Sequence, residues 1–125
     1  MTDSVERLYE GVIRARQSDP TRSRTARLLR SGRAKMAKKL AEEAVEVVID
    51  AMHGNREAVV KESADLIYNL VVLWVSSGVQ PKEVWKEMER RERLFGIAEK
   101  LTKETPDDPR RKVVALDSRR LRKRR

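Results

Sequence analysis

"KKLAEEAVEVVIDA" at residues 38–51, followed by "KESADLIYNLVVLW" at residues 61–74, decides the fold. Apolar residues recur in both stretches with the periodicity of a helix. Between them lies "HGN" at 53–55, where a glycine can end the first helix. We therefore expect helices over about 34–52 and 56–76, joined by a short turn as antiparallel neighbours.

The rest of the chain also carries helix signals. Asp3 or Ser4 can cap a first helix, and the proline-containing stretch 17–23 ends it. A short helix follows, and Pro81 suits the first turn of a last helix that runs to about Ile97. Convincing strand alternation is lacking, so the expected fold class is all-α.

The composition limits the class of protein. The 125 residues are enough for one domain with a modest core. The chain has no cysteine, which excludes a disulfide framework, a thiolate zinc site and a cysteine nucleophile. The amino terminus does not resemble a signal peptide, and no apolar run approaches the roughly 20 residues of a membrane span. We expect a cytoplasmic protein that does not enter a membrane.

The net charge of +9 is concentrated near the carboxyl terminus. Residues 102–125 hold ten Lys or Arg and four Asp or Glu, and they end in "RRLRKRR". We therefore expect an all-α domain over residues 1–101 and a basic, flexible extension over 102–125. The extension leaves open a second class of function, a helical protein that binds nucleic acid through this tail. The acidic central helices and the scarcity of aromatic side chains for base stacking argue against that class.

Five carboxylates lie on the two central helices: Glu42, Glu43, Glu46, Glu62 and Asp65. Lys38 and Lys39 lie four residues before two of them, so a salt-bridged, solvent-facing surface would explain the first group. The second group lies on a helix that is apolar almost all round, where Glu62, Asp65 and Asn69 form a polar stripe. Buried carboxylates that lie together repel one another unless a cation neutralises them, and this favours a metal site.

The ligand type indicates which metal. Carboxylate oxygens suit hard divalent cations, so we expect Mg²⁺, with Mn²⁺ as a usual substitute. Such a cation assists cleavage of a phosphoanhydride, because it screens phosphate charge and lowers the pKa of an attacking water.

The carboxylates follow the pattern Glu-Glu-x-x-Glu, fifteen intervening residues, and Glu-x-x-Asp. This spacing resembles the metal motif of the all-α nucleoside triphosphate pyrophosphohydrolase superfamily. The flanks are "LYEGVIRARQSDPTRSRTARLLRSGRAKMAKKLAEEAVEVV" and "ESADLIYNLVVLWVSSGVQPKEVWKEMERR". Over residues 5–91 they resemble the phosphoribosyl-ATP pyrophosphohydrolases of histidine biosynthesis.

The resemblance implies a helical bundle of four to five helices per chain, assembled as a homodimer or a larger homo-oligomer. It implies Mg²⁺-dependent hydrolysis of phosphoribosyl-ATP between its α and β phosphates, which yields phosphoribosyl-AMP and pyrophosphate. The implied metal ligands are Glu43, Glu46, Glu62 and Asp65. The implied catalytic residues are Glu42, Glu43 and Glu46, with Glu42 as a further ligand or as the group that orients and deprotonates water. The implied substrate-binding residues are Lys38, Lys39, Arg24 and Asn69.

Three positions depart from the family pattern. Arg24 stands where a Tyr is usual, Ala41 where a Gly is common and Asn69 where a His is often found. Six basic residues precede the carboxylate helix: Arg22, Arg24, Arg27, Arg30, Arg33 and Lys35. They either attract polyphosphate or form a solvated surface. The departures leave open a house-cleaning enzyme that hydrolyses other nucleoside triphosphates, or a paralogue with little activity.

Overall fold

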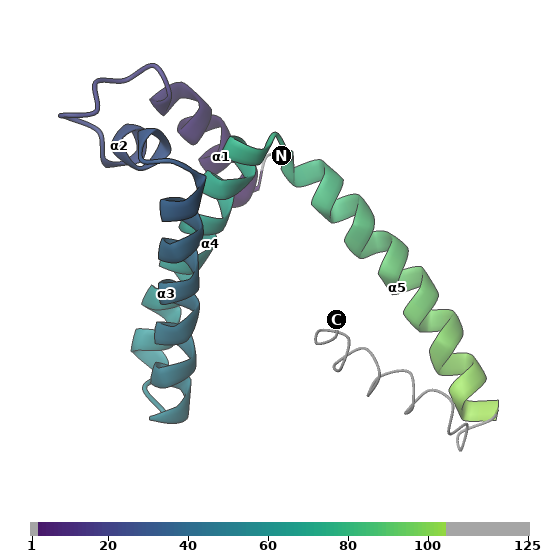
Figure 1. Ribbon diagram of the computed structural model, residues 1–125. Helices are drawn as coiled ribbons and strands as arrows, with labels where there is room; N and C mark the ends of the chain where they lie inside the picture. Colours follow the sequence, from purple (N-terminus) through teal and green to yellow (C-terminus); the bar gives the residue numbers. More distant parts are fainter. Residues whose placement is uncertain (1–2, 105–125) are drawn as a thin grey trace, which may run out of the picture. The chain divides into compact units, whose positions relative to one another are not determined.

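Five helices make up the described part of the chain (Figure 1). The computed structural model describes residues 3–104, with side chains over residues 3–96. The helices are α1 (Ser4–Ala15), α2 (Arg24–Arg30), α3 (Arg33–Met52), α4 (Arg56–Ser77) and α5 (Pro81–Glu104). No strand occurs among the described residues, so the expected all-α fold is confirmed. Within the same residues, no helix has the length and apolar character that a membrane crossing requires.

The ends of the helices follow the local sequence, with one exception. Asp3 caps α1, because its side chain accepts a hydrogen bond from the Glu6 backbone N–H at 2.6 Å. The expected end of the last helix near Ile97 was wrong, since α5 continues to Glu104. Residues 98–104 contain mostly good helix formers and no glycine or proline to stop the helix. The rest of the expected basic extension, residues 105–125, lies outside the described residues.

Contacts within the chain divide it into two compact units, Met1–Trp85 and Lys86–Arg125. The first unit holds α1 to α4 and the beginning of α5. In the second unit, Glu87 accepts hydrogen bonds from Arg90 at 2.7 Å and from Arg91 at 3.0 Å. These bonds lower the pKa of Glu87 to about 2. The domain boundary that we expect at residue 101 stays a prediction.

The antiparallel hairpin of α3 and α4 is the centre of the first unit, and the two helices lie side by side (Figure 1). Its turn follows the expected glycine stop. Gly54 has a φ of 70°, which a glycine adopts without strain, and the exposed His53 is the C-terminal cap of α3. Asn55 then caps α4, because its side chain accepts a hydrogen bond from the Ala58 backbone N–H at 3.1 Å.

A small core fills one end of this hairpin, where α1 and α2 pack on it. Its buried residues are Val12, Met36, Val71, Val72 and Val75. The other end is not covered by α1 or α2, and its exposed large apolar residues on α3 and α4 are Val45, Val48, Ile49, Met52, Val60 and Ile67. The nearly all-round apolar sequence of α4 predicts that the helix is buried on most sides. The second half of α4 is buried in this way, and the first half is not.

Two contacts fix α2 in place. The hydroxyl groups of Thr25 and Tyr68 hydrogen bond at 2.6 Å, which ties α2 to α4. Ser23 caps α2, since its Oγ accepts a hydrogen bond from the Ala26 backbone N–H at 3.0 Å. This short helix forms one wall of a cavity, so these contacts also fix that wall.

Truncating the buried Met36 tests the packing of the core. Met36→Ala leaves a cavity beside Val71 and Val72, so we expect it to lower the free energy of unfolding by about 2–5 kcal/mol. Urea denaturation measures the change. Met88→Ala is the control, because the Met88 side chain is 55% exposed and its removal should cost little. Equal losses in the two variants would contradict the assigned core.

Candidate active site

The hairpin brings carboxylates from both of its helices together. One oxygen each from Glu43, Glu62 and Asp65 lies within 4.8 Å of the others. Glu43 comes from the middle of α3, and Glu62 and Asp65 come from the first half of α4. These three residues, called the carboxylate set below, occupy the hairpin next to the core. The face-to-face arrangement that the sequence predicts for the two acidic groups is therefore present for these three.

The environment of the carboxylate set fits a hard cation. Glu43 is 7% exposed, although carboxylates are rarely so buried without compensation. One oxygen of Glu43 and one of Glu62 are buried and have no hydrogen-bond partner among the described residues. Lys39 pairs with the other Glu43 oxygen at 3.6 Å, and this is the ion pair that the described residues supply to the three carboxylates. A divalent cation would supply both the missing charge and the missing partners of these oxygens.

Glu62 shows the mutual repulsion most clearly. Its carboxyl lies close to those of Glu46 and Glu43, and the pKa of Glu62 rises to about 7. The main cause is a hydrogen bond between the side chains of Glu62 and Glu46, followed by one with Glu43, because the protonated form of Glu62 can donate and the ionised form cannot. Burial and the negative charges of both neighbours act in the same direction. Glu46 is thus a neighbour of Glu62, although it lies outside the carboxylate set.

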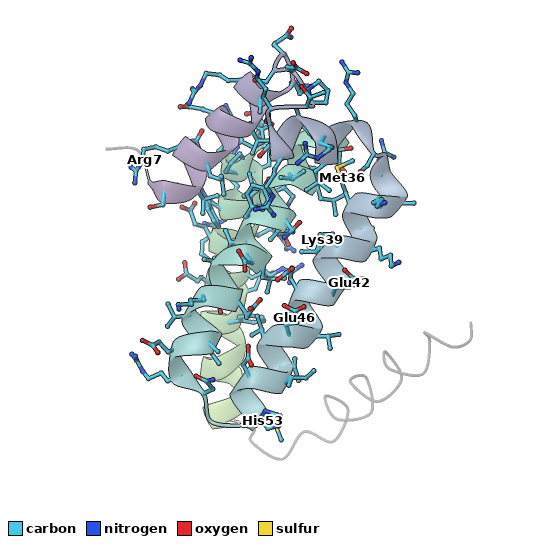
Figure 2. The ribbon with its side chains drawn as sticks, turned by 90° about the vertical axis from the view of Figure 1, so that its left-hand side faces the viewer. Arg7, Met36, Lys39, Glu42, Glu46 and His53 are labelled. Atoms are coloured by element: carbon cyan, nitrogen blue, oxygen red, sulfur yellow. The ribbon has the colours of Figure 1, made fainter. Side chains whose placement is uncertain are left out.

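Not every residue named from the sequence lies with the carboxylate set. Glu42 is exposed, and it follows Lys39 and precedes Glu46 along α3 (Figure 2). Lys38 is also exposed, and among the described ion pairs it has none with Glu42. The salt-bridged surface expected from the lysine spacing is therefore reduced to one pair, Lys39 with Glu43.

A cavity of about 290 Å³ lies beside the carboxylate set, and we call it the basic cavity. Its wall comes from α2, α3 and α4, and includes Arg24, Arg27, Lys35, Lys39, Tyr68 and Asn69. Three of the four residues expected to bind substrate lie here, and Lys38 is the exception. Arg27 belongs to α2 and Lys35 to the first turn of α3, and only the placement of α2 shows that they share a wall.

A second hollow, of about 240 Å³, lies on the other side of the carboxylate set along the hairpin. It is lined by Glu46, Ile49, Asp50 and Glu62. Asp50 was not foreseen as part of the site, although it lies one helical turn after Glu46 and therefore on the same face of α3. The hairpin thus changes from basic to acidic along its length, with the carboxylate set between.

Comparison with known proteins agrees with this arrangement. The model of the family described as phosphoribosyl-ATP pyrophosphohydrolase matches residues 5–92, which is more than two thirds of the chain and includes α2, α3, α4 and all of α1 except its first residue. The chain belongs to this family. The phosphoribosyl-ATP pyrophosphohydrolase match includes the carboxylate set and the whole wall of the basic cavity.

Individual relatives extend the phosphoribosyl-ATP pyrophosphohydrolase match. "Phosphoribosyl-ATP pyrophosphatase 2" of Rhodopseudomonas palustris is 60% identical over 100% of both chains. The protein of the same name from Bradyrhizobium diazoefficiens is 59% identical over 99% of both. "Phosphoribosyl-ATP pyrophosphatase" of Gluconobacter oxydans is 51% identical over 77% of this chain and 72% of its own. The likeness to the first two includes residues beyond the family match.

The raised pKa of Glu62 predicts a pH dependence of stability when EDTA removes divalent cations. The folded-state pKa of about 7 exceeds the ordinary value of 4.5, so the folded chain binds more protons than the unfolded chain between these pH values. Glu62 therefore contributes stability at low pH, and this contribution is lost as pH rises through 7. Glu62→Gln stays neutral and should be the more stable protein at pH 8 but not at pH 4.

Urea denaturation midpoints of the wild type and of Glu62→Gln, measured in EDTA from pH 4 to 8, test this expectation. The difference between the two proteins should grow between pH 4.5 and 7 and then level off. Glu10→Gln, on an exposed part of α1, is the control and should show no such trend. A constant difference for Glu62→Gln would contradict the raised pKa of Glu62.

Proposed function

We propose that this chain hydrolyses phosphoribosyl-ATP to phosphoribosyl-AMP and pyrophosphate, a step of histidine biosynthesis. The membership of the family and the names of the relatives with 60% and 59% identity support the substrate. The observation that carries the proposal is the carboxylate set, whose unpartnered oxygens lie next to a basic cavity. Polyphosphate chemistry needs both a cation to screen charge and basic groups to hold the substrate. Because phosphoribosyl-ATP is a phosphorylated biosynthetic intermediate, the protein would act on it in the cytoplasm.

We assign Mg²⁺ to the carboxylate set, with Mn²⁺ as a substitute. Glu43, Glu62 and Asp65 would hold it, and Glu46 would join them from its position beside Glu62. All these ligands are oxygens, which is the preference of both cations. The bound cation would screen the phosphates and lower the pKa of the attacking water.

The remaining side chains would position the substrate. Lys39 lines the basic cavity and also pairs with Glu43, so its ammonium group lies where a phosphate would pass from one region to the other. Arg24 and Asn69 line the same cavity, and the exposed Lys38 would add charge at its margin. Glu42 lies on the exposed side of α3 between Lys39 and Glu46, where a carboxylate can orient and deprotonate water that arrives from solvent.

We also propose that the chain works as a homodimer or a larger homo-oligomer. The apolar residues at the uncovered end of the hairpin, Val45, Val48, Ile49, Met52, Val60 and Ile67, are between 43% and 80% exposed. They lie on the hairpin that carries the carboxylate set. Exposed apolar groups that cluster in this way are typical of a surface that pairs with another chain. A second copy packed here would lie next to the acidic hollow.

Removing one proposed ligand tests the function. Glu46→Gln keeps the size of an exposed side chain, so the fold should persist while pyrophosphate release from phosphoribosyl-ATP falls about 100-fold or more. Release is measured with Mg²⁺, with Mn²⁺ and with EDTA, and the wild type should be inactive in EDTA. Glu10→Gln is the control, because Glu10 is an exposed carboxylate on α1 away from the hairpin's acidic groups.

The same assay includes a panel of ordinary nucleoside triphosphates. A clear preference for phosphoribosyl-ATP supports the biosynthetic enzyme. Faster hydrolysis of another triphosphate would replace the proposal with a house-cleaning enzyme. Full activity of Glu46→Gln would remove Glu46 from the site.

A charge placed on the exposed apolar surface tests the assembly. Val48→Glu introduces a carboxylate that a dimer interface would have to bury, so we expect this variant to be a monomer. Analytical ultracentrifugation measures the mass of the wild type and the variant at equal concentration. Ala34→Glu, at an exposed position in the first turn of the same helix, should leave the assembly unchanged. An unchanged mass for Val48→Glu would show that the subunits associate elsewhere.

A further inference from the structure

The basic cavity carries charge that its own wall does not balance. It is lined by four basic residues, and no Asp or Glu among the described residues contributes to the wall. Arg27 is held in place, because its guanidinium donates a hydrogen bond to the Pro20 carbonyl at 2.7 Å. A wall of this kind attracts an anion, and arginine suits phosphate because it can donate two parallel hydrogen bonds.

One residue of the cavity wall, Asn69, carries a hydrogen-bond acceptor without a partner among the described residues. Asn69 is only 3% exposed, and its Nδ2 donates a hydrogen bond to the Asp65 carbonyl at 2.8 Å. Its Oδ1 is buried and accepts no hydrogen bond from the described residues. An unpaired buried acceptor costs free energy, so this oxygen suits a ligand that donates a hydrogen bond, such as a ribose hydroxyl.

Size and apolar wall restrict the ligand further. Leu28 and the ring of Tyr68 add carbon surface to the wall. The volume of about 290 Å³ is at the lower end of pockets that enclose a whole small molecule, roughly 300–1,000 Å³. The cavity therefore fits one part of a nucleotide, and that part has a carbon frame, a hydroxyl donor and a negative charge.

The basic cavity continues directly from the carboxylate set. Lys39 lies one turn before Glu43, and Lys35 lies one turn further, so the wall extends about 12 Å along α3 from Glu43. On α4, Asn69 likewise lies one turn after Asp65. A ligand with one end at the carboxylate set can therefore place its other end in the cavity.

We propose that the basic cavity binds the second ribose 5-phosphate of phosphoribosyl-ATP, the group that distinguishes this substrate from ATP. The inference rests on the proposed function and names the residues that give it specificity. Arg24, Arg27 and Lys35 bind the phosphate, and Asn69 Oδ1 accepts a hydrogen bond from a ribose hydroxyl. The triphosphate end then lies at the carboxylate set. ATP alone leaves the cations of the cavity unpaired and is held less tightly.

The leaving pyrophosphate is the other anion that the cavity could receive. Two features disfavour it. Pyrophosphate has no carbon surface to contact Leu28 and Tyr68, and its ionised oxygens offer no hydrogen bond to the Asn69 acceptor. An anionic oxygen beside this uncharged acceptor would be repelled, because both atoms present lone pairs and neither has a proton to donate. The ribose phosphate satisfies both the cations and the acceptor.

Three probes separate these ligands in titration calorimetry with Mg²⁺ present. Phosphoribosyl-AMP carries the second ribose phosphate, AMP lacks it, and pyrophosphate stands for the leaving group. The proteins are the wild type, Arg24→Ala, Lys35→Ala and the control Arg30→Ala. Arg30 lies on the same helix as Arg24 and is exposed, but it does not line the cavity.

We expect the wild type to bind phosphoribosyl-AMP at least about ten-fold more tightly than AMP, because phosphate held by charged donors adds affinity. Arg24→Ala and Lys35→Ala should each lower the affinity for phosphoribosyl-AMP about ten-fold. Their affinities for AMP and for pyrophosphate should stay within about two-fold of those of the wild type. Arg30→Ala should leave all three affinities unchanged. This selective loss is the signature of the second phosphate.

Other results overturn the inference. If the variants lose affinity for AMP and for phosphoribosyl-AMP equally, the substituted residues contact the AMP part that both ligands share. If the variants lose affinity for pyrophosphate, the cavity binds the leaving group. A similar loss of affinity in Arg30→Ala would mean that the basic residues attract the ligand by their general positive charge and that the cavity is not a specific site. Pyrophosphate release from phosphoribosyl-ATP is assayed in the same preparation. If pyrophosphate is released normally from phosphoribosyl-ATP but the variants do not weaken phosphoribosyl-AMP selectively, this inference alone is overturned. If pyrophosphate is released only from other triphosphates, the proposed function is overturned, and this inference with it.

Discussion

The antiparallel contact between α3 and α4 is the interaction on which both the core and the candidate active site depend. At one end of the hairpin the contact buries Met36 against Val71 and Val72, which stabilises the fold through apolar burial. A few turns further along, the same contact forces Glu43, Glu62 and Asp65 together, which opposes folding through charge repulsion. The apolar packing therefore keeps the two helices together where the carboxylates repel one another. Functional sites commonly combine local instability with support from the surrounding structure in this way.

Much of this arrangement can be predicted from the sequence, because its signals are local. Helix periodicity, the cap at Asp3 and the turn at Gly54 depend on neighbouring residues, and all three agree with the structure. The pairing of Glu43 with Glu62 and Asp65 also follows, since a short turn permits only a close antiparallel neighbour. The end of α5 was mispredicted, because residues 98–104 contain no glycine or proline that would stop the helix near Ile97. The helix propensity of these residues proved sufficient to continue the helix.

The basic cavity could not be derived from sequence patterns, because it depends on where α2 packs. Arg24 and Arg27 are close in sequence, but Lys35, Lys39 and Asn69 join them only after α2 folds over the hairpin. Two of the departures from the usual family pattern, Arg24 and Asn69, lie in this one cavity. They add a cation and an unpaired acceptor to the same wall, and neither of them replaces a carboxylate of the carboxylate set.

The short helix α2 has a consequence for how tightly the protein can hold a ligand. With seven residues it is far below the length at which a helix persists alone, so its order depends on its packing and on the hydroxyl pair of Thr25 and Tyr68. Part of the free energy of ligand binding in the cavity therefore offsets the cost of keeping this wall folded. A change at Thr25, which is not in the cavity wall, would alter the apparent affinity by changing the fraction of molecules whose wall is already formed. The affinity for a ligand in this cavity can thus be adjusted at a distance from the ligand, through the folding equilibrium of about two turns of helix.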